Sequence, residues 1–270
     1  MTFEPRMLLD TPLPPGRMIT SEDSSDGNQI LWLSDGPVAP GLWARIRAEH
    51  ARTGLWPLLL DCRDPGDSEF RPWASGELSP ERMSSPGDHD PAELLAHWWH
   101  GYTVTGEVDD VLPPAERLAV TAPFGQRWPG LAPGRPTGPD PDKEAAEYAE
   151  FFASLRARVR LGLVPAASGA DALAVAGWDG PANYDNDTAK FSTVLRTWEQ
   201  RFGARVVAVG FDTLHLSIAT PPTQTEDALL IAAEHFAFCP DNIWQGSRPH
   251  TLISYADQLV DAHSWEFWWD

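Results

Sequence analysis

Apolar residues repeat at helical spacing in some segments of the chain and at alternate positions in others. The clearest helical segment has apolar residues at positions i, i+3, i+4, i+7 and i+11: Phe191, Val194, Leu195, Trp198 and Phe202. This spacing places one apolar stripe along a helix. We expect Asp187 to cap the start of this helix and Gly203 to end it.

A second segment repeats this spacing after a helix start at Asp140-Pro141, with the apolar residues Tyr148, Phe151, Phe152, Leu155 and Val159. Further helices are predicted at Pro40 to Thr53, Pro91 to Gly101, Thr223 to about Cys239, and Pro249 to Val260. Thr223 with Glu226 fits a capping box, and Pro240 stops that helix.

Strands are predicted where short apolar runs alternate with polar residues or are rich in β-branched residues. These runs are 30–33, 56–60, 161–164, 205–209, 213–218 and 265–269. In 213–218 we expect His215 to lie on a polar face, at the surface or hydrogen-bonded. In the last run Trp265, Phe267 and Trp269 are expected inward, with Trp268 on the other face.

The remaining segments predict irregular structure and one division of the chain. Residues 1–28 are expected to form an irregular lead-in, residues 61–89 a long loop, and residues 165–183 a turn-rich segment. Residues 123–141 hold six prolines and four glycines, which predicts an extended tether. We therefore expect an N-terminal α/β portion over 1–138 and a C-terminal α+β domain over 139–270.

These elements together predict the α+β class. The C-terminal half is expected to form a small antiparallel sheet covered by helices, with the N-terminal portion packed against it. Thirteen tryptophans in 270 residues predict a core with a large aromatic share.

Charge and cysteine content narrow the classes of function. The net charge of −19 disfavours direct binding to a nucleic-acid backbone and suits a basic protein partner. Two cysteines are too few for a disulfide framework, and no signal peptide is visible, so we expect a cytoplasmic protein. No apolar run approaches the ~18–20 residues that span a bilayer.

The C-terminal half contains four successive motifs that are rich in uncommon residue types. They are Leu195-Arg196-x-Trp198-x-x-Arg201-Phe202-Gly203-Ala204, then Pro221-Pro222, then Glu234-His235-Phe236-x-Phe238-Cys239-Pro240-Asp241, and finally Phe267-Trp268-Trp269-Asp270. This series resembles the bacterial family called domain of unknown function 4253 (DUF4253), over about residues 160–270. The resemblance implies no known reaction, cofactor or partner.

The sharpest chemical candidate is the group His235, Cys239 and Asp241. His235 and Cys239 are four residues apart on a helix and can share a face, as a nucleophilic pair or the start of a zinc site requires. Asp241 is then placed to orient the imidazole. The alternative is structural: the negative end of the helix dipole raises the pKa of a thiol, and Asp241 caps backbone N–H groups.

Other candidates are single residues or weaker groups. Glu234, Trp244 and Trp268 are candidate ligand-binding residues. Asp270 is expected to pair with an arginine such as Arg201 or Arg205. A weak metal candidate is the set Glu93, His97 and His100, which share one helix face but lack the spacing of His-Glu-x-x-His.

Phosphate-binding glycine loops, a G-x-S-x-G elbow and a Cys-x-x-Cys pair do not occur in the sequence. We expect no cofactor and favour a non-enzymatic protein-interaction module, immunity-like or regulatory. The alternative is an enzyme or small-ligand binder that uses His235, Cys239 and Asp241.

Overall fold

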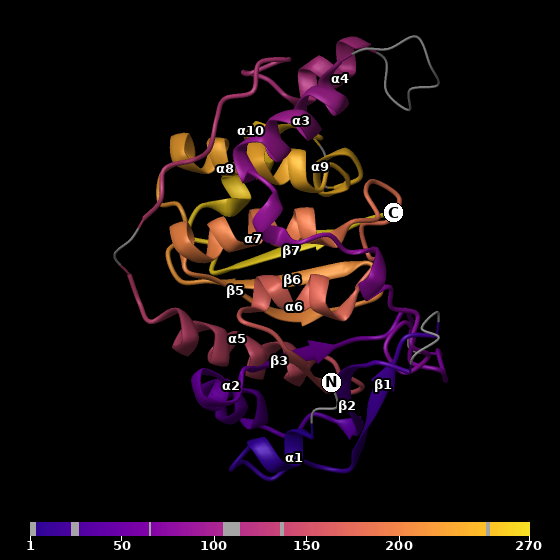
Figure 1. Cartoon of the computed structure of the whole chain (residues 1–270). Helices are drawn as coiled ribbons and strands as arrows, with labels where there is room; N and C mark the ends of the chain where they lie inside the picture. Colours follow the sequence, from indigo (N-terminus) through magenta and orange to yellow (C-terminus); the bar gives the residue numbers. More distant parts are fainter. Residues whose placement is uncertain (1–3, 23–26, 65, 105–113, 136–137, 247–248) are drawn as a thin grey trace.

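One mixed sheet of seven strands runs through the whole protein. The computed structural model describes all residues except 1–3, 23–26, 65, 105–113, 136–137 and 247–248 (Figure 1). In these residues the strand order is β1-β2-β4-β3-β5-β6-β7. The strands are β1 (Gly16–Thr20), β2 (Gln29–Pro37), β3 (Leu55–Leu60), β4 (Arg160–Pro165), β5 (Ala204–Val209), β6 (Thr213–Ile218) and β7 (Ser264–Trp268).

The pairing interleaves the two halves of the chain. β4 lies between β2 and β3, with Leu163 opposite Trp32 on one side and Pro57 on the other. β3 then pairs in parallel with β5, where Leu60 lies opposite Val209. The other five pairings are antiparallel. β4 and β5 are therefore joined into one sheet through β3, a strand of the N-terminal half.

Helices cover both faces of the sheet (Figure 1). The α-helices are α1 (Pro5–Leu8), α2 (Leu42–Thr53), α3 (Pro91–Thr103), α4 (Pro114–Val120), α5 (Pro141–Leu155), α6 (Gly169–Ala176), α7 (Thr188–Phe202), α8 (Thr225–Phe238), α9 (Asp241–Trp244) and α10 (Leu252–Leu259). Two short 3₁₀ helices, η1 (Pro80–Arg82) and η2 (Pro86–Asp88), lie in the loop after β3.

Each face of the sheet has its own hydrophobic core. α2 and α5 bury Trp43, Ile46 and Phe152 against one face. α3, α6, α7, α8 and α10 cover the other face in a larger core that contains Trp198 and Phe267. The protein is therefore of the predicted α+β class, with helices on both sides of a shared sheet.

The most periodic segments form the predicted elements. α7 begins after Asp187, whose side chain accepts a hydrogen bond from the N–H of Ala189, and it ends at Gly203, which has a φ of +60°. Glycine adopts this left-handed conformation without the steric cost of a Cβ atom. Trp265, Phe267 and Trp269 point into the core as expected, each no more than 2% exposed.

Several expectations about local structure are wrong. The lead-in contains α1 and β1, and the segment after β4 contains α6. α6 is built largely from small residues (GADALAVA), so a strong amphipathic stripe is missing. α8 begins after Gln224 without a side-chain cap, so the capping box is not formed.

The apolar stripe expected on α5 is also only partly correct. Phe152 is buried, but Phe151 and Leu155 are 59% and 64% exposed. Ala145 and Ala149 are buried beside Phe152 instead. Small residues therefore make part of the contact between α5 and the sheet, and two large ones face outward.

The described part of the proline-rich segment is attached to the C-terminal half. The N–H of Ala132 donates to Glu234 Oε1 at 2.7 Å, and the N–H of Arg135 donates to the carbonyl of Arg201 at 2.8 Å. Ala132 is 3% exposed. Residues 136–137 of the predicted tether lie outside the described residues, and the boundary near residue 138 stays a prediction.

Candidate functional site

Glu234 lies inside the protein and is held by four hydrogen bonds. Arg201 on α7 donates to both carboxylate oxygens, at 2.7 Å from Nη1 and 2.6 Å from Nη2. Trp198 Nε1 and the N–H of Ala132 donate at 2.7 Å each. The Glu234 side chain is fully buried and that of Arg201 is 15% exposed. This arrangement joins α7, α8 and the proline-rich segment, and it occupies both oxygens of the candidate ligand-binding residue.

His235 is enclosed by aromatic rings. Its ring centroid lies 4.4 Å from that of Trp265, 4.9 Å from Phe267 and 5.0 Å from Trp198. Nδ1 lies 3.1 Å from the hydroxyl of Tyr255, and Nε2 has no hydrogen-bond partner among the described residues. Burial, and then the charge of Arg201, lower the pKa of His235 well below its usual value. The imidazole is therefore neutral at physiological pH.

Cys239 is a buried thiol that donates a hydrogen bond. Its Sγ lies 3.0 Å from the carbonyl of Trp268 and 3.5 Å from Oδ1 of Asn242. Burial raises the pKa of this thiol. A protonated thiol bonded to a carbonyl is a poor nucleophile, which agrees with the structural alternative drawn from its position at a helix end.

Asp241 is bonded to groups other than His235. It accepts from the Tyr184 hydroxyl at 2.6 Å, from Gln245 Nε2 at 3.0 Å and from the N–H of Asp270 at 3.0 Å. Burial and this bond raise the pKa of Tyr184. Asp241 therefore connects α9 to the loop after α6 and to the chain end after β7.

Asn242 connects the elements of this corner, and no motif or spacing in the sequence singles it out. Its Nδ2 donates to the carbonyl of Glu266 at 2.6 Å and to the Tyr255 hydroxyl at 3.2 Å, and its Oδ1 accepts from the N–H of Trp268 at 3.1 Å. A side chain that bonds to α10 and β7 at once fixes where these elements meet.

Trp244 and Trp268 are both half-buried. The Trp244 ring lies 5.3 Å from Phe236 and 5.7 Å from Tyr102, so it packs beside α8 and α3. Their role as ligand contacts stays a prediction. The expected pairing of Asp270 is not formed, because Arg201 binds Glu234 and Arg205 Nε binds Asp142 at 2.9 Å.

The weak metal candidates all lie on the solvent side of α3. Glu93, His97 and His100 are exposed. Among the residues that the structure describes, no three side chains of His, Cys, Asp or Glu are grouped so that they could hold a metal ion.

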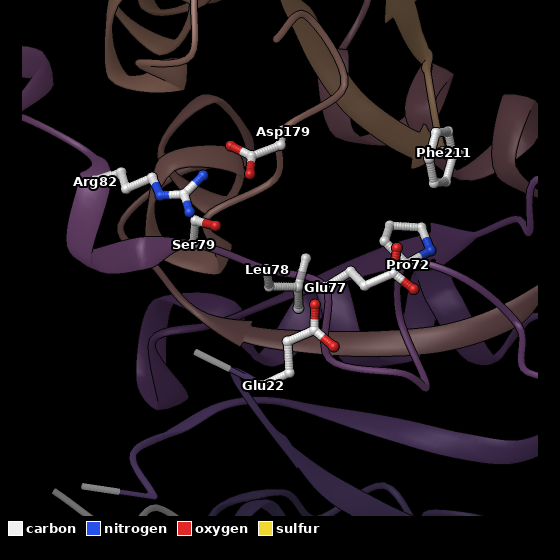
Figure 2. A pocket seen from close by; sticks show the side chains of 8 residues that line it. All are labelled: Glu22, Pro72, Glu77, Leu78, Ser79, Arg82, Asp179 and Phe211. Carbon is white, nitrogen blue, oxygen red and sulfur yellow. The ribbon is translucent and has the colours of Figure 1, made fainter. Parts of the chain in front are cut away.

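A pocket of about 250 Å³ opens between the loop after β3, the loop after α6 and the turn after β5. It is lined by Glu22, Pro72, Glu77, Leu78, Ser79, Arg82, Asp179 and Phe211. Figure 2 shows Arg82 and Asp179 on one side, Pro72 and Phe211 on the other, and Glu22 and Glu77 between them. Glu77 binds Arg71 through both oxygens, at 2.5 and 2.6 Å, which lowers the pKa of Glu77. Three carboxylates and one guanidinium thus surround a partly apolar hollow.

One of three comparisons with known proteins found a match, and it lies in the C-terminal half of the chain. The fold and the buried corner define an α+β protein whose distinctive residues lie on α7, α8, α9 and β7. Residues 160–270 match the model of the family described as "Domain of unknown function (DUF4253)", which confirms the resemblance seen in the sequence. Comparison with curated proteins and with solved structures found no match.

The matched segment is not a complete sheet by itself. It includes β4, β5, β6 and β7, and β3 lies between the first two. Within the described residues no helix is long and apolar enough to cross a membrane.

Proposed function

We propose that this chain is a non-catalytic protein-interaction module of the bacterial cytoplasm, immunity-like or regulatory, that binds a basic protein. The observation that carries the proposal is the placement of the predicted catalytic groups. His235, Cys239 and Asp241 are each no more than 1% exposed, and each is engaged in internal hydrogen bonds. These groups form bonds that stabilise the fold, so the surface of the protein is the better candidate for the functional site.

The charge of the surface supports a basic partner. Three of the acidic residues that contribute to the net charge of −19, Glu22, Glu77 and Asp179, line the pocket of Figure 2 together with Phe211. Glu77 is already bound by Arg71, so the exposed Glu22 is the carboxylate best placed to meet the guanidinium or ammonium group of a partner's arginine or lysine. A like-charged or nucleic-acid partner is disfavoured by the same field.

The alternative function, catalysis or small-ligand binding at the His235 corner, receives less support from the geometry. The three pockets described in this chain are lined by other residues. An enzyme with this corner as its centre needs an opening of α10 or β7 to admit a substrate.

The proposal is tested by affinity capture with the tagged full chain, in lysate of the source organism. We expect basic proteins to be retained at about 0.1 M salt and released at about 1 M, because the Debye length falls from about 10 to about 3 Å. Glu22→Lys should reduce retention, whereas Glu147→Lys, an exposed position on α5, should not. Retention that is insensitive to salt and to Glu22→Lys would contradict the proposal.

A further inference from the structure

Arg160, the first residue of β4, is stacked on an aromatic ring. Its guanidinium carbon lies 4.1 Å from the centroid of the Phe70 ring. Phe70 is 1% exposed, so this platform is fixed in the core. A guanidinium stacked on a ring still presents its N–H groups at the edge of the plane, where they can bind an acceptor.

In the part of the chain that the structure describes, no acceptor is paired with the Arg160 guanidinium. Among the described residues, the Arg160 guanidinium forms neither an ion pair nor a hydrogen bond to a side chain or carbonyl, and it is stacked on the Phe70 ring. Three other arginines of the C-terminal half do have acidic partners: Arg201 binds Glu234, Arg205 binds Asp142 and Arg196 binds Asp171. Arg160 therefore has unused donors in a half-buried setting.

A pocket of about 560 Å³ adjoins these donors. Its lining residues are Arg17, Asp35, Ser68, Glu69, Ala74, Ser75 and Arg160. Arg17 Nη1 lies 3.2 Å from Asp35 Oδ1, and Ser75 donates its hydroxyl to the carbonyl of Pro72 at 3.1 Å. This pocket is lined by a different set of residues from the acidic pocket of Figure 2.

The pocket lining carries two guanidiniums, of Arg17 and Arg160, and two carboxylates, of Asp35 and Glu69. Burial, then the charges of Arg17 and Arg158, lower the pKa of Arg160. An anion near Arg160 relieves this repulsion between like charges. The two carboxylates of the lining repel an anion. Asp35 is paired with Arg17, and Glu69 is exposed to solvent. They oppose a dianion more strongly than a monoanion.

We propose that this pocket is a binding site for a carboxylate group, which Arg160 engages with two parallel N–H donors while stacked on Phe70. The planar fork of a guanidinium matches a carboxylate in geometry and charge. The ligand is a small organic acid or the C-terminus of a peptide. Both present the same singly charged, planar group. This site is independent of the proposed basic partner, since it selects an anion.

The test uses the isotope-labelled full chain and follows the Nε–Hε signal of Arg160 by NMR. The probes are sodium acetate, and an N-acetylated dipeptide with either a free or an amidated C-terminus. Sodium chloride and sodium phosphate at matched ionic strength are the controls. We expect saturable shifts with acetate and with the free peptide, and none with the amidated one. A free peptide that binds at least tenfold tighter than acetate identifies a peptide C-terminus as the source, and equal or weaker binding identifies a small acid.

Variants separate recognition from folding. Arg160→Gln should weaken acetate binding about tenfold or more, read from signals of Ser68 and Ser75. Arg160→Lys keeps the charge but loses the planar fork, so its affinity for acetate should lie between that of Arg160→Gln and that of the parent chain. Arg45→Gln, at an exposed arginine on α2, should bind acetate as the parent does. The proposal is overturned if Arg160→Gln binds acetate unchanged, if phosphate binds more tightly than acetate, or if no probe shifts the Arg160 signal.

Discussion

Glu234→Gln is the substitution that tests the interior of the protein most sharply. Glutamine has nearly the same shape as glutamate, so the change removes the charge without opening a cavity. The carboxylate accepts four hydrogen bonds, two from Arg201 and one each from Trp198 and Ala132. A glutamine amide has one acceptor oxygen, and its NH₂ group then faces donors of Arg201 and a neighbour.

The expected cost follows from these contacts. Two of the four hydrogen bonds lose their acceptor, and hydrogen bonds to charged groups contribute about 1.5–3 kcal/mol each. The Arg201 charge, 15% exposed, also loses its counter-charge, and breaking a buried ion pair costs about 3–5 kcal/mol. The first route gives a loss of about 3–6 kcal/mol and the second about 3–5 kcal/mol, a large part of the about 5–15 kcal/mol that stabilises a typical domain.

The assay is urea denaturation at neutral pH, followed by tryptophan fluorescence. Glu226→Gln, at an exposed position on the same helix, is the matched control and should change the free energy of unfolding by less than about 0.5 kcal/mol. A loss below about 1 kcal/mol for Glu234→Gln would show that the Glu234–Arg201 pair is not the central tie between α7 and α8.

Three further predictions concern pH, thiol chemistry and chain truncation. Burial lowers the pKa of His215 to about 3 and that of His235 well below its usual value. The unfolded chain therefore binds more protons below about pH 6.5, and the free energy of unfolding should fall between about pH 6.5 and 5, by up to about 1.4 kcal/mol per pH unit per histidine; a flat profile in denaturation experiments would refute this. Mass spectrometry after iodoacetamide treatment of the folded protein should find Cys239 unlabelled and the partly exposed Cys62 labelled first; rapid modification of Cys239 would contradict its burial. A chain of residues 139–270 alone should lack cooperative unfolding, because β3 is missing between β4 and β5; a sharp transition would show that this half folds alone.

The hydrophobic pattern predicted the helices and strands that have one clearly apolar and one clearly polar face. α7 has a continuous apolar stripe and a cap at each end, and β7 alternates cleanly, so both could be predicted from spacing alone. α6 could not, because small residues suit several conformations and its burial comes from the elements around it.

Contacts between elements far apart in the sequence determined the features that the hydrophobic pattern did not predict. His215 alternates with Leu214 and Leu216 and was expected on a polar face. α5 covers that face, and Phe152 lies 4.7 Å from the His215 ring, which is buried as a result. The insertion of β4 between β2 and β3 is of the same kind, because it pairs strands more than a hundred residues apart.

At the candidate site, too, the sequence pattern did not predict which side chains are partners. Residue types in the sequence pointed to the α8–α9 corner as the sharpest chemical candidate. Spacing did not reveal that Arg201, 33 residues earlier in the chain, supplies the counter-charge of Glu234. Nor did it reveal that Asn242 and Tyr255, rather than Asp241, reach the His235–Cys239 pair.

The affinity of a captured basic partner for three variants distinguishes a function of the acidic surface from a function of the buried corner. Isothermal titration should show that Glu22→Lys weakens binding several-fold, because a second cation, beside Arg82, then replaces a carboxylate in the lining of the pocket of Figure 2. Glu147→Lys and Cys239→Ala should bind as the parent chain does. If Cys239→Ala abolishes binding in a folded protein while Glu22→Lys leaves it unchanged, function lies in the buried corner and the acidic pocket is not the binding surface.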